Sequence, residues 1–204
     1  MKSFSTRLAL VCAGAGSILT LVGCGGAAPD TASATPSESS AVSSSPDAGF
    51  GSPTRSPAGT PRGLEIEAIG VDAPIIEVGT EADGSQEVPT SVHEVGWWAP
   101  GTEPGASGTG VLVGHTYSLG EGVFDDLDAL RVGDTIRVVA SDGVAEFAVE
   151  RVKSVPVEEF GAMAADIYRI AGEPRLVLMT CGDFDGSDYR ATVIVYARLV
   201  LLRA

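Results

Sequence analysis

The chain has 204 residues, the length of one ordinary domain with additional segments. It carries 27 acidic and 13 basic side chains and a formal net charge of −14. Nucleic-acid binding is therefore close to excluded, because affinity for phosphates comes largely from lysine and arginine. The 26 Gly and 12 Pro residues are more than a helical bundle tolerates, so the composition favours strands and loops.

The N-terminus has the pattern of an export signal. Lys2 and Arg7 precede an uncharged run over residues 8–22, which is shorter than the ~20 residues of a membrane-spanning helix. Residues 21–24 (LVGC) resemble the lipobox of bacterial lipoprotein precursors. This resemblance implies that residues 1–23 are a cleaved signal peptide and that Cys24 carries the lipid. An uncleaved signal anchor is the alternative, and both put the domain on the outer face of the cytoplasmic membrane, facing the cell wall.

Residues 24–62 are predicted to form a disordered tether. Of the 38 residues from 25 to 62, 31 are Gly, Ala, Ser, Pro or Thr, too few large apolar groups to form a core. Residues 1–62 hold four basic and three acidic side chains, so residues 63–204 hold nine and 24, a net charge of −15. The acidity belongs to the second segment, which we expect to be the folded domain.

The segment 63–204 reads as a β-sheet protein. Only residues 125–130 and 158–170 have helical patterning. Residues 191–199 alternate in character, which places Ala191, Val193 and Val195 on one face of a strand. The predicted fold class is all-β, a sandwich or closed barrel of seven or eight strands with one or two short helices. Seven predicted strands cover residues 64–69, 73–78, 110–113, 135–140, 145–152, 176–180 and 191–199.

Cys181 is the one thiol in the predicted domain, since Cys12 lies in the signal and Cys24 is the lipid site. An unpaired cysteine in an exported protein is either a reactive group or an intermolecular partner. The structural alternative is a small buried apolar residue. Cys181 follows the apolar strand 176–180 and precedes a polar loop, a position that favours access to solvent.

Two further residues have a similar placement. His115 stands at the end of the predicted strand that includes residues 110–113, whereas His93 is interpreted as a hydrogen-bonded loop residue. Arg190 is the first residue of the last predicted segment, and eight residues (182–189) separate it from Cys181. If the strands flanking that loop are neighbours, Arg190 and Cys181 share one end of the sheet.

In this order, these residues resemble the sortases, the cysteine transpeptidases of Gram-positive surfaces. The resemblance extends over residues 63–201 and is most like the actinobacterial class F group. It is carried by residues 114–116 (GHT), 178–181 (LMTC) and Arg190, with residues 69–74 (IGVDAP) and 95–98 (VGWW) upstream.

The resemblance implies a closed barrel of seven to eight strands and a transpeptidase site. Cys181 would be the nucleophile, His115 the general acid and base, and Arg190 the oxyanion donor, with Thr116 and Thr180 supporting them. The implied substrate is an LPxTG-like sorting signal cleaved between Thr and Gly. The implied acceptor is an amine of peptidoglycan or of a pilin-like protein, or water. We also expect the enzyme to be a monomer and to need no cofactor.

Other classes of cysteine enzyme match the order and motifs of these residues less well. Papain-like peptidases place Cys before His, whereas His115 precedes Cys181 by 66 residues. The L,D-type wall transpeptidases carry a Ser-x-Gly-Cys-x-Arg block, and residues 179–184 (MTCGDF) do not. One cysteine and two histidines without the spacing of a zinc motif do not form a set of zinc ligands, so no metal is expected. A non-catalytic surface lipoprotein with a β-barrel binding module remains the alternative, and it requires none of the three site residues.

Overall fold

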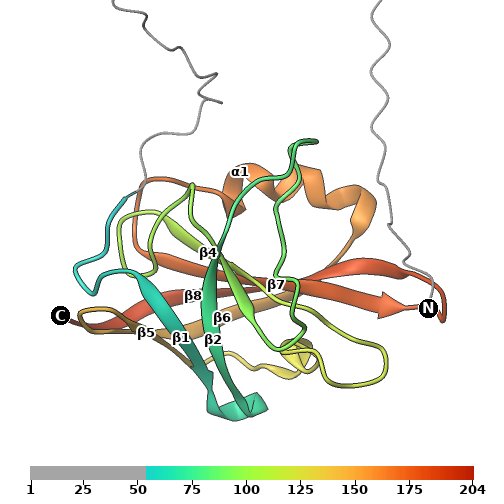
Figure 1. Ribbon diagram of the computed structural model, residues 1–204, viewed down its shortest axis with the longest axis horizontal. Helices are drawn as coiled ribbons and strands as arrows, with labels where there is room; N and C mark the ends of the chain where they lie inside the picture. Colours follow the sequence, from blue (N-terminus) through green and yellow to red (C-terminus); the bar gives the residue numbers. More distant parts are fainter. Residues whose placement is uncertain (1–53) are drawn as a thin grey trace, which may run out of the picture. The chain divides into compact units, whose positions relative to one another are not determined.

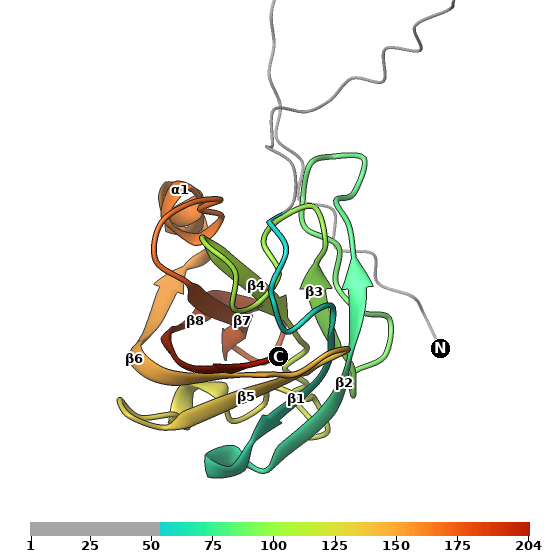
Figure 2. The ribbon, with the colours of Figure 1, turned by 90° about the vertical axis from the view of Figure 1, so that its left-hand side faces the viewer.

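The computed structural model describes residues 54–204, which form a closed β-barrel. Eight strands in this range follow the order β1-β2-β3-β4-β7-β8-β6-β5 around the barrel, and β5 pairs back with β1. Figure 2 shows the strands arranged in a ring, with the short helix outside it. The predicted all-β barrel is thereby confirmed. The strands are β1 (Pro61–Ile66), β2 (Val71–Val78), β3 (Val95–Trp98), β4 (Thr109–Val113), β5 (Thr135–Ala140), β6 (Val144–Pro156), β7 (Arg175–Phe184) and β8 (Tyr189–Arg203).

The eighth strand, β3, is not among the seven that the sequence predicts. All four of its residues are buried, so it shows no alternation of polar and apolar side chains. It pairs in parallel with β2 and antiparallel with β4. The predicted strand over residues 64–69 ends earlier, because residues 67–69 turn away in the 3-10 helix η1 (Glu67–Ile69). That turn closes at Gly70, whose φ of 67° favours glycine.

Both faces of the central strands are buried. Leu176 and Leu178 point into the barrel core, whereas Val177 and Met179 of the same strand pack in a second cluster outside it. The same holds for β8, where Ile194 is buried on the face opposite to the predicted apolar face. The outer cluster exists because the segment after β6 covers this side of the barrel.

The covering segment is less regular than the predicted helix over residues 158–170. It consists of the 3-10 helix η3 (Val157–Met163) followed by a single turn of α-helix, α1 (Ala164–Ile167). Ile167 is fully buried, but Ile170 is 44% exposed, so the apolar face ends one turn earlier than predicted. The second predicted helix, over residues 125–130, is reduced to the 3-10 helix η2 (Leu127–Ala129).

The ordered domain begins before Gly63, so the predicted end of the tether at residue 62 is wrong. Ser56 and Ala58 are buried, and β1 starts at Pro61. The carboxylate of Glu103, itself 1% exposed, holds this segment by accepting hydrogen bonds from the Ser56 N–H at 2.6 Å and from Arg55 at 3.1 Å. A buried carboxylate needs such partners, and these come from residues that composition alone assigns to the tether.

The remaining N-terminal predictions concern residues outside the described range: the signal over residues 1–23, the lipid site Cys24, and the tether up to residue 53. Within residues 54–204, no helix has both the length and the apolar character needed to cross a membrane.

Candidate active site

Strand pairing brings His115 and Cys181 to the same end of the barrel. β4 and β7 are parallel neighbours, and their register ends with Val113 opposite Met179. The Gly114 N–H donates to the Met179 carbonyl at 3.2 Å, so the chain beyond β4 stays beside β7. Two positions beyond the last pair on each strand are His115 and Cys181. Residues 66 apart in the sequence thus lie at the same end of the barrel.

Arg190 reaches the same end through the β7–β8 hairpin. In Figure 1 the two strands run across the barrel, and their hairpin lies at the end opposite to the C-terminus. Cys181 pairs with Thr192 and Gly182 with Ala191, which makes Arg190 the diagonal neighbour of Cys181. Diagonal neighbours in an antiparallel pair lie roughly 7–8 Å apart, within reach of an arginine side chain. The two strands are therefore neighbours, which is the condition under which Arg190 and Cys181 share one end of the sheet.

Cys181 does not end its strand, contrary to the sequence-based interpretation. β7 continues to Phe184, which pairs with Tyr189, so the turn begins three residues later than expected. Even so, Cys181 is a free thiol with an exposed side chain. It lines a cavity of about 260 Å³ together with the carboxylates of Asp125 and Asp183.

The surroundings of the Cys181 thiol favour its protonated form. Although the side chain is exposed on one side, the protein atoms around the sulfur displace water and raise the pKa of the thiol above its ordinary value. Burial alone accounts for this rise. No charged neighbour in the described part of the chain offsets this rise.

Arg190 is engaged by Asp185 in the hairpin. Its Nε donates to Asp185 Oδ2 at 2.7 Å, and its Nη2 contacts the same oxygen. The backbone N–H groups of Asp188 and Ser187, followed by the Arg190 guanidinium, lower the pKa of Asp185 to about 2. The carboxylate is therefore ionised at neutral pH, and it pairs with the Arg190 guanidinium. With 65% of the Arg190 side chain exposed, the pair is a surface ion pair.

His115 is oriented by a backbone carbonyl. Its Nε2 lies 2.6 Å from the Pro89 oxygen. A carbonyl oxygen can only accept, so Nε2 carries the proton and Nδ1 is left to take up or release one. Pro89 belongs to the long connection between β2 and β3. The imidazole is thus half-buried between that connection and the end of β4.

The two supporting threonines join the strand ends. The Thr180 hydroxyl donates to the Gly114 carbonyl at 2.8 Å and lies 2.7 Å from the Thr116 hydroxyl, which is also 3.2 Å from the Phe124 carbonyl oxygen. The Tyr189 hydroxyl donates to the Thr116 carbonyl at 3.0 Å and ties β8 to the same segment. Burial raises the pKa of Tyr189, and negative charge on Cys181 adds to the rise, as expected for two groups that lie close together.

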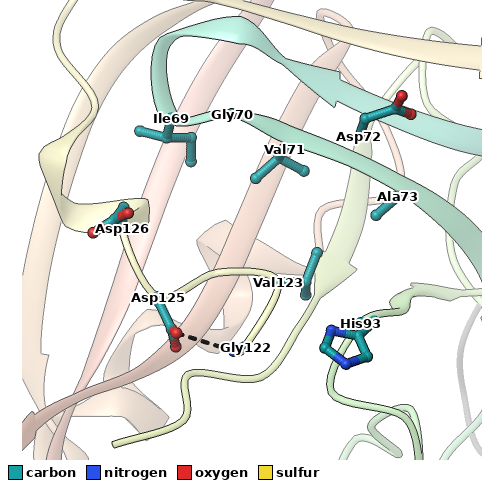
Figure 3. A pocket seen from close by; sticks show the side chains of 10 residues that line it. All are labelled: Ile69, Gly70, Val71, Asp72, Ala73, His93, Gly122, Val123, Asp125 and Asp126. Carbon is teal, nitrogen blue, oxygen red and sulfur yellow. Dashed lines mark hydrogen bonds between the residues drawn. The ribbon is translucent and has the colours of Figure 1, made fainter. Parts of the chain in front are cut away.

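A second cavity, of about 240 Å³, lies beside the first. It is lined by the turn after η1, by His93 and by the segment that includes Asp125 and Asp126 (Figure 3). Asp125 lines both cavities, so its segment forms the wall between them. In residues 54–204, no group of three His, Cys, Asp or Glu side chains is arranged to hold a metal ion.

Residues 64–200 match the family described as Sortase domain, about two thirds of the chain. The chain belongs to the sortase family. Sortase C-1 from Actinomyces oris is similar in fold, with a TM-score of 0.56 at 23% identity, covering 69% of this chain and 71% of that one. Sortase A from Listeria monocytogenes has a TM-score of 0.57 at 15% identity, covering 71% and 90%. A lid mutant of sortase A from Corynebacterium diphtheriae has a TM-score of 0.55 at 20% identity, covering 71% and 72%. No curated protein matches the sequence.

Several residues that shape this end of the barrel are not among those predicted from the sequence. Pro89 acts through its carbonyl group, which no side-chain pattern reveals. Asp185 lies in the turn between two paired strands, and an aspartate five residues before an arginine in a short turn is a weak signal for the pair. Tyr189 and Asp125 contribute hydrogen bonds to backbone groups, which depend on the folded arrangement.

Iodoacetamide labelling of the full chain tests the state of the thiol in this sortase-family protein. Because the pKa of Cys181 is raised, the native labelling rate should increase with pH and reach no plateau below about pH 9, the ordinary value. Mass mapping separates Cys181 from Cys24. A plateau near neutral pH would show a stabilised thiolate, and labelling only after unfolding would show a core residue.

Proposed function

We propose that the protein is a cysteine transpeptidase that cleaves an LPxTG-like sorting signal between Thr and Gly and transfers the new carboxyl end to an amine or to water. The observation that carries the proposal is the strand register at one end of the barrel. The β4–β7 pairing supports the proximity of His115 and Cys181, and the β7–β8 hairpin supports that of Arg190. Family membership supports the same class of reaction.

The reaction proceeds through a thioacyl enzyme. Nδ1 of His115 accepts the thiol proton, and the Cys181 thiolate attacks the Thr carbonyl carbon. Arg190 donates to the developing oxyanion, and its planar fork suits this role better than the point charge of lysine. When the C–N bond breaks, protonated His115 gives its proton to the leaving Gly amine. The acceptor amine then attacks the thioacyl carbon, loses a proton to His115 and releases Cys181.

Substrate must rearrange the resting contacts before this reaction can occur. In residues 54–204, Cys181 has no hydrogen bond to His115 or Arg190, and Arg190 is paired with Asp185. An exposed ion pair contributes only about 0–1 kcal/mol, so a bound peptide carbonyl can draw the guanidinium away at small cost. The raised pKa of Cys181 then falls as the cation approaches, and the thiolate forms only with substrate present.

The sequence motifs support a more specific class of sortase and a mode of membrane attachment. The short connection between Cys181 and Arg190, together with residues 69–74 and 95–98, supports a class F sortase. The lipobox-like residues 21–24 support attachment through Cys24 to the outer face of the cytoplasmic membrane. A monomer there would meet exported proteins that carry sorting signals and the amines of peptidoglycan or pilin-like acceptors.

Matched substitutions in the full chain test the three assignments. Cys181→Ala should abolish turnover of a fluorogenic sorting-signal peptide, with or without an added amine. His115→Ala should also abolish it, while His93→Ala should not. Arg190→Lys keeps the positive charge but removes the planar guanidinium and its paired donors, so the rate of turnover should fall by about 10²–10³-fold. Its control is Arg198→Lys, because Arg198 lies on the same strand and is 60% exposed.

These variants also separate an enzyme from a binding barrel. A non-catalytic module would bind peptide without turnover in any variant and would not discriminate Arg190 from lysine except in affinity. Unchanged turnover in Cys181→Ala would eliminate the thioacyl mechanism, and unchanged turnover in Arg190→Lys would remove the oxyanion role alone.

Membrane attachment has its own test. Intact-mass analysis of protein extracted from membranes should show loss of residues 1–23 and a lipid increment on Cys24, because two or more acyl chains are needed for firm anchoring. Replacement of Cys24 by alanine should leave the precursor unprocessed. An unmodified full-length N-terminus in the native protein would instead identify a signal anchor.

A further inference from the structure

One carboxylate closes the loop that follows His115. Asp125 Oδ1 accepts from the Tyr117 N–H at 2.6 Å, while Oδ2 accepts from the N–H groups of Glu121 at 2.7 Å and Gly122 at 3.0 Å. The last of these bonds is drawn in Figure 3. Three backbone donors on an irregular loop are therefore satisfied by a single side chain.

The loop is closed tightly enough to exclude a side chain at Gly122. A Cβ atom there would lie 2.6 Å from the His115 carbonyl oxygen and 2.6 Å from Asp125 Oδ1, and 2.8 Å from the Tyr117 nitrogen. The end of the loop thus packs directly on its beginning. Glycine is required at this position because of space.

The same segment holds the His115 backbone. The Phe124 N–H, adjacent to Asp125, donates to the His115 carbonyl at 3.0 Å. Cys181, by contrast, is held by the ladder of β7 with β8. The position of the imidazole relative to the sulfur therefore depends on how the loop is closed.

We infer that Asp125 is a positioning residue for His115, an inference that rests on the proposed function and deepens it. Asp125 binds backbone amides on both sides of the loop, and the loop in turn sets where the imidazole stands relative to the thiol. Without the carboxylate, the three amide groups would have to form hydrogen bonds with water instead, and the loop would open. His115 would then lose its alignment for proton transfer. Misplacement by about 1 Å is enough to lower a rate by about 10²-fold.

The test compares Asp125→Asn with Asp126→Asn in the full chain. Asparagine keeps the size of the side chain but replaces one acceptor oxygen by an NH2 donor, which faces N–H groups that need an acceptor. Asp126 is the matched control: it is the adjacent aspartate, it is exposed, and its carboxylate makes no hydrogen bond to residues 54–204. Three quantities are measured by NMR and by peptide turnover: exchange protection of the amides of Tyr117, Glu121 and Gly122, the ring resonances of His115, and kcat with KM.

In Asp125→Asn we expect loss of protection at the three amides, a shift of the His115 ring resonances, and a fall of kcat by about 10- to 100-fold with KM within about twofold. Asp126→Asn should match the wild type in all three. Gly122→Ala, which disturbs the loop without removing charge, should lower kcat in the same way.

Unchanged protection, ring resonances and kcat in Asp125→Asn would overturn the inference. A raised KM with unchanged kcat would also overturn it, since it would make Asp125 a substrate contact in the cavity that it lines. If the wild type has no turnover, the proposed function fails. The amide protection and His115 resonances then still decide whether Asp125 holds the histidine.

Discussion

The site depends on the position of β7 between β4 and β8. On one side its ladder with β4 is parallel, and on the other its ladder with β8 is antiparallel. Alternate residues of β7 point into the barrel or outward, so a slip of one residue in either register would turn the Cys181 side chain to the opposite face of the strand. The buried residues of both clusters, such as Leu178 inside and Met179 outside, fix that register because neither can be exposed without loss of apolar burial. The chemistry of the thiol thus depends on packing along the strand.

The polar side chains of His115 and Arg190 both have hydrogen-bond partners other than Cys181. Arg190 is neutralised by Asp185, and the His115 Nε2 proton is donated to the Pro89 carbonyl. Burial raises the pKa of the Cys181 thiol and so favours its protonated form. A protonated thiol reacts slowly with oxidants, since the thiolate is the reactive form. In the proposed mechanism, the substrate carbonyl would be the new acceptor for Arg190, so that substrate binding and activation of the thiol would occur together.

Much of the barrel could be predicted from the sequence, because its strands are runs of β-branched residues between turn signals. Strand β3 was not predicted because its buried residues show no alternation of polar and apolar side chains. The order of residues 54–62 was not predicted because it depends on hydrogen bonds to one buried residue, Glu103. His115, Cys181 and Arg190 were found because each stands near a strand end and carries reactive chemistry. Asp125, Asp185 and the Pro89 carbonyl could not be found, because their partners are backbone groups or side chains brought near by the fold.

The central claim is that this end of the barrel forms a covalent bond to a sorting signal at Cys181. Intact-mass analysis of the full chain after incubation with an LPxTG-containing peptide, quenched at short times without an amine, measures it most directly. The account predicts a mass increase equal to the peptide up to its threonine, less one water, located on the peptide that contains Cys181 and absent from Cys181→Ala. An unmodified chain in the presence of cleaved peptide, or an adduct on another residue, would contradict it.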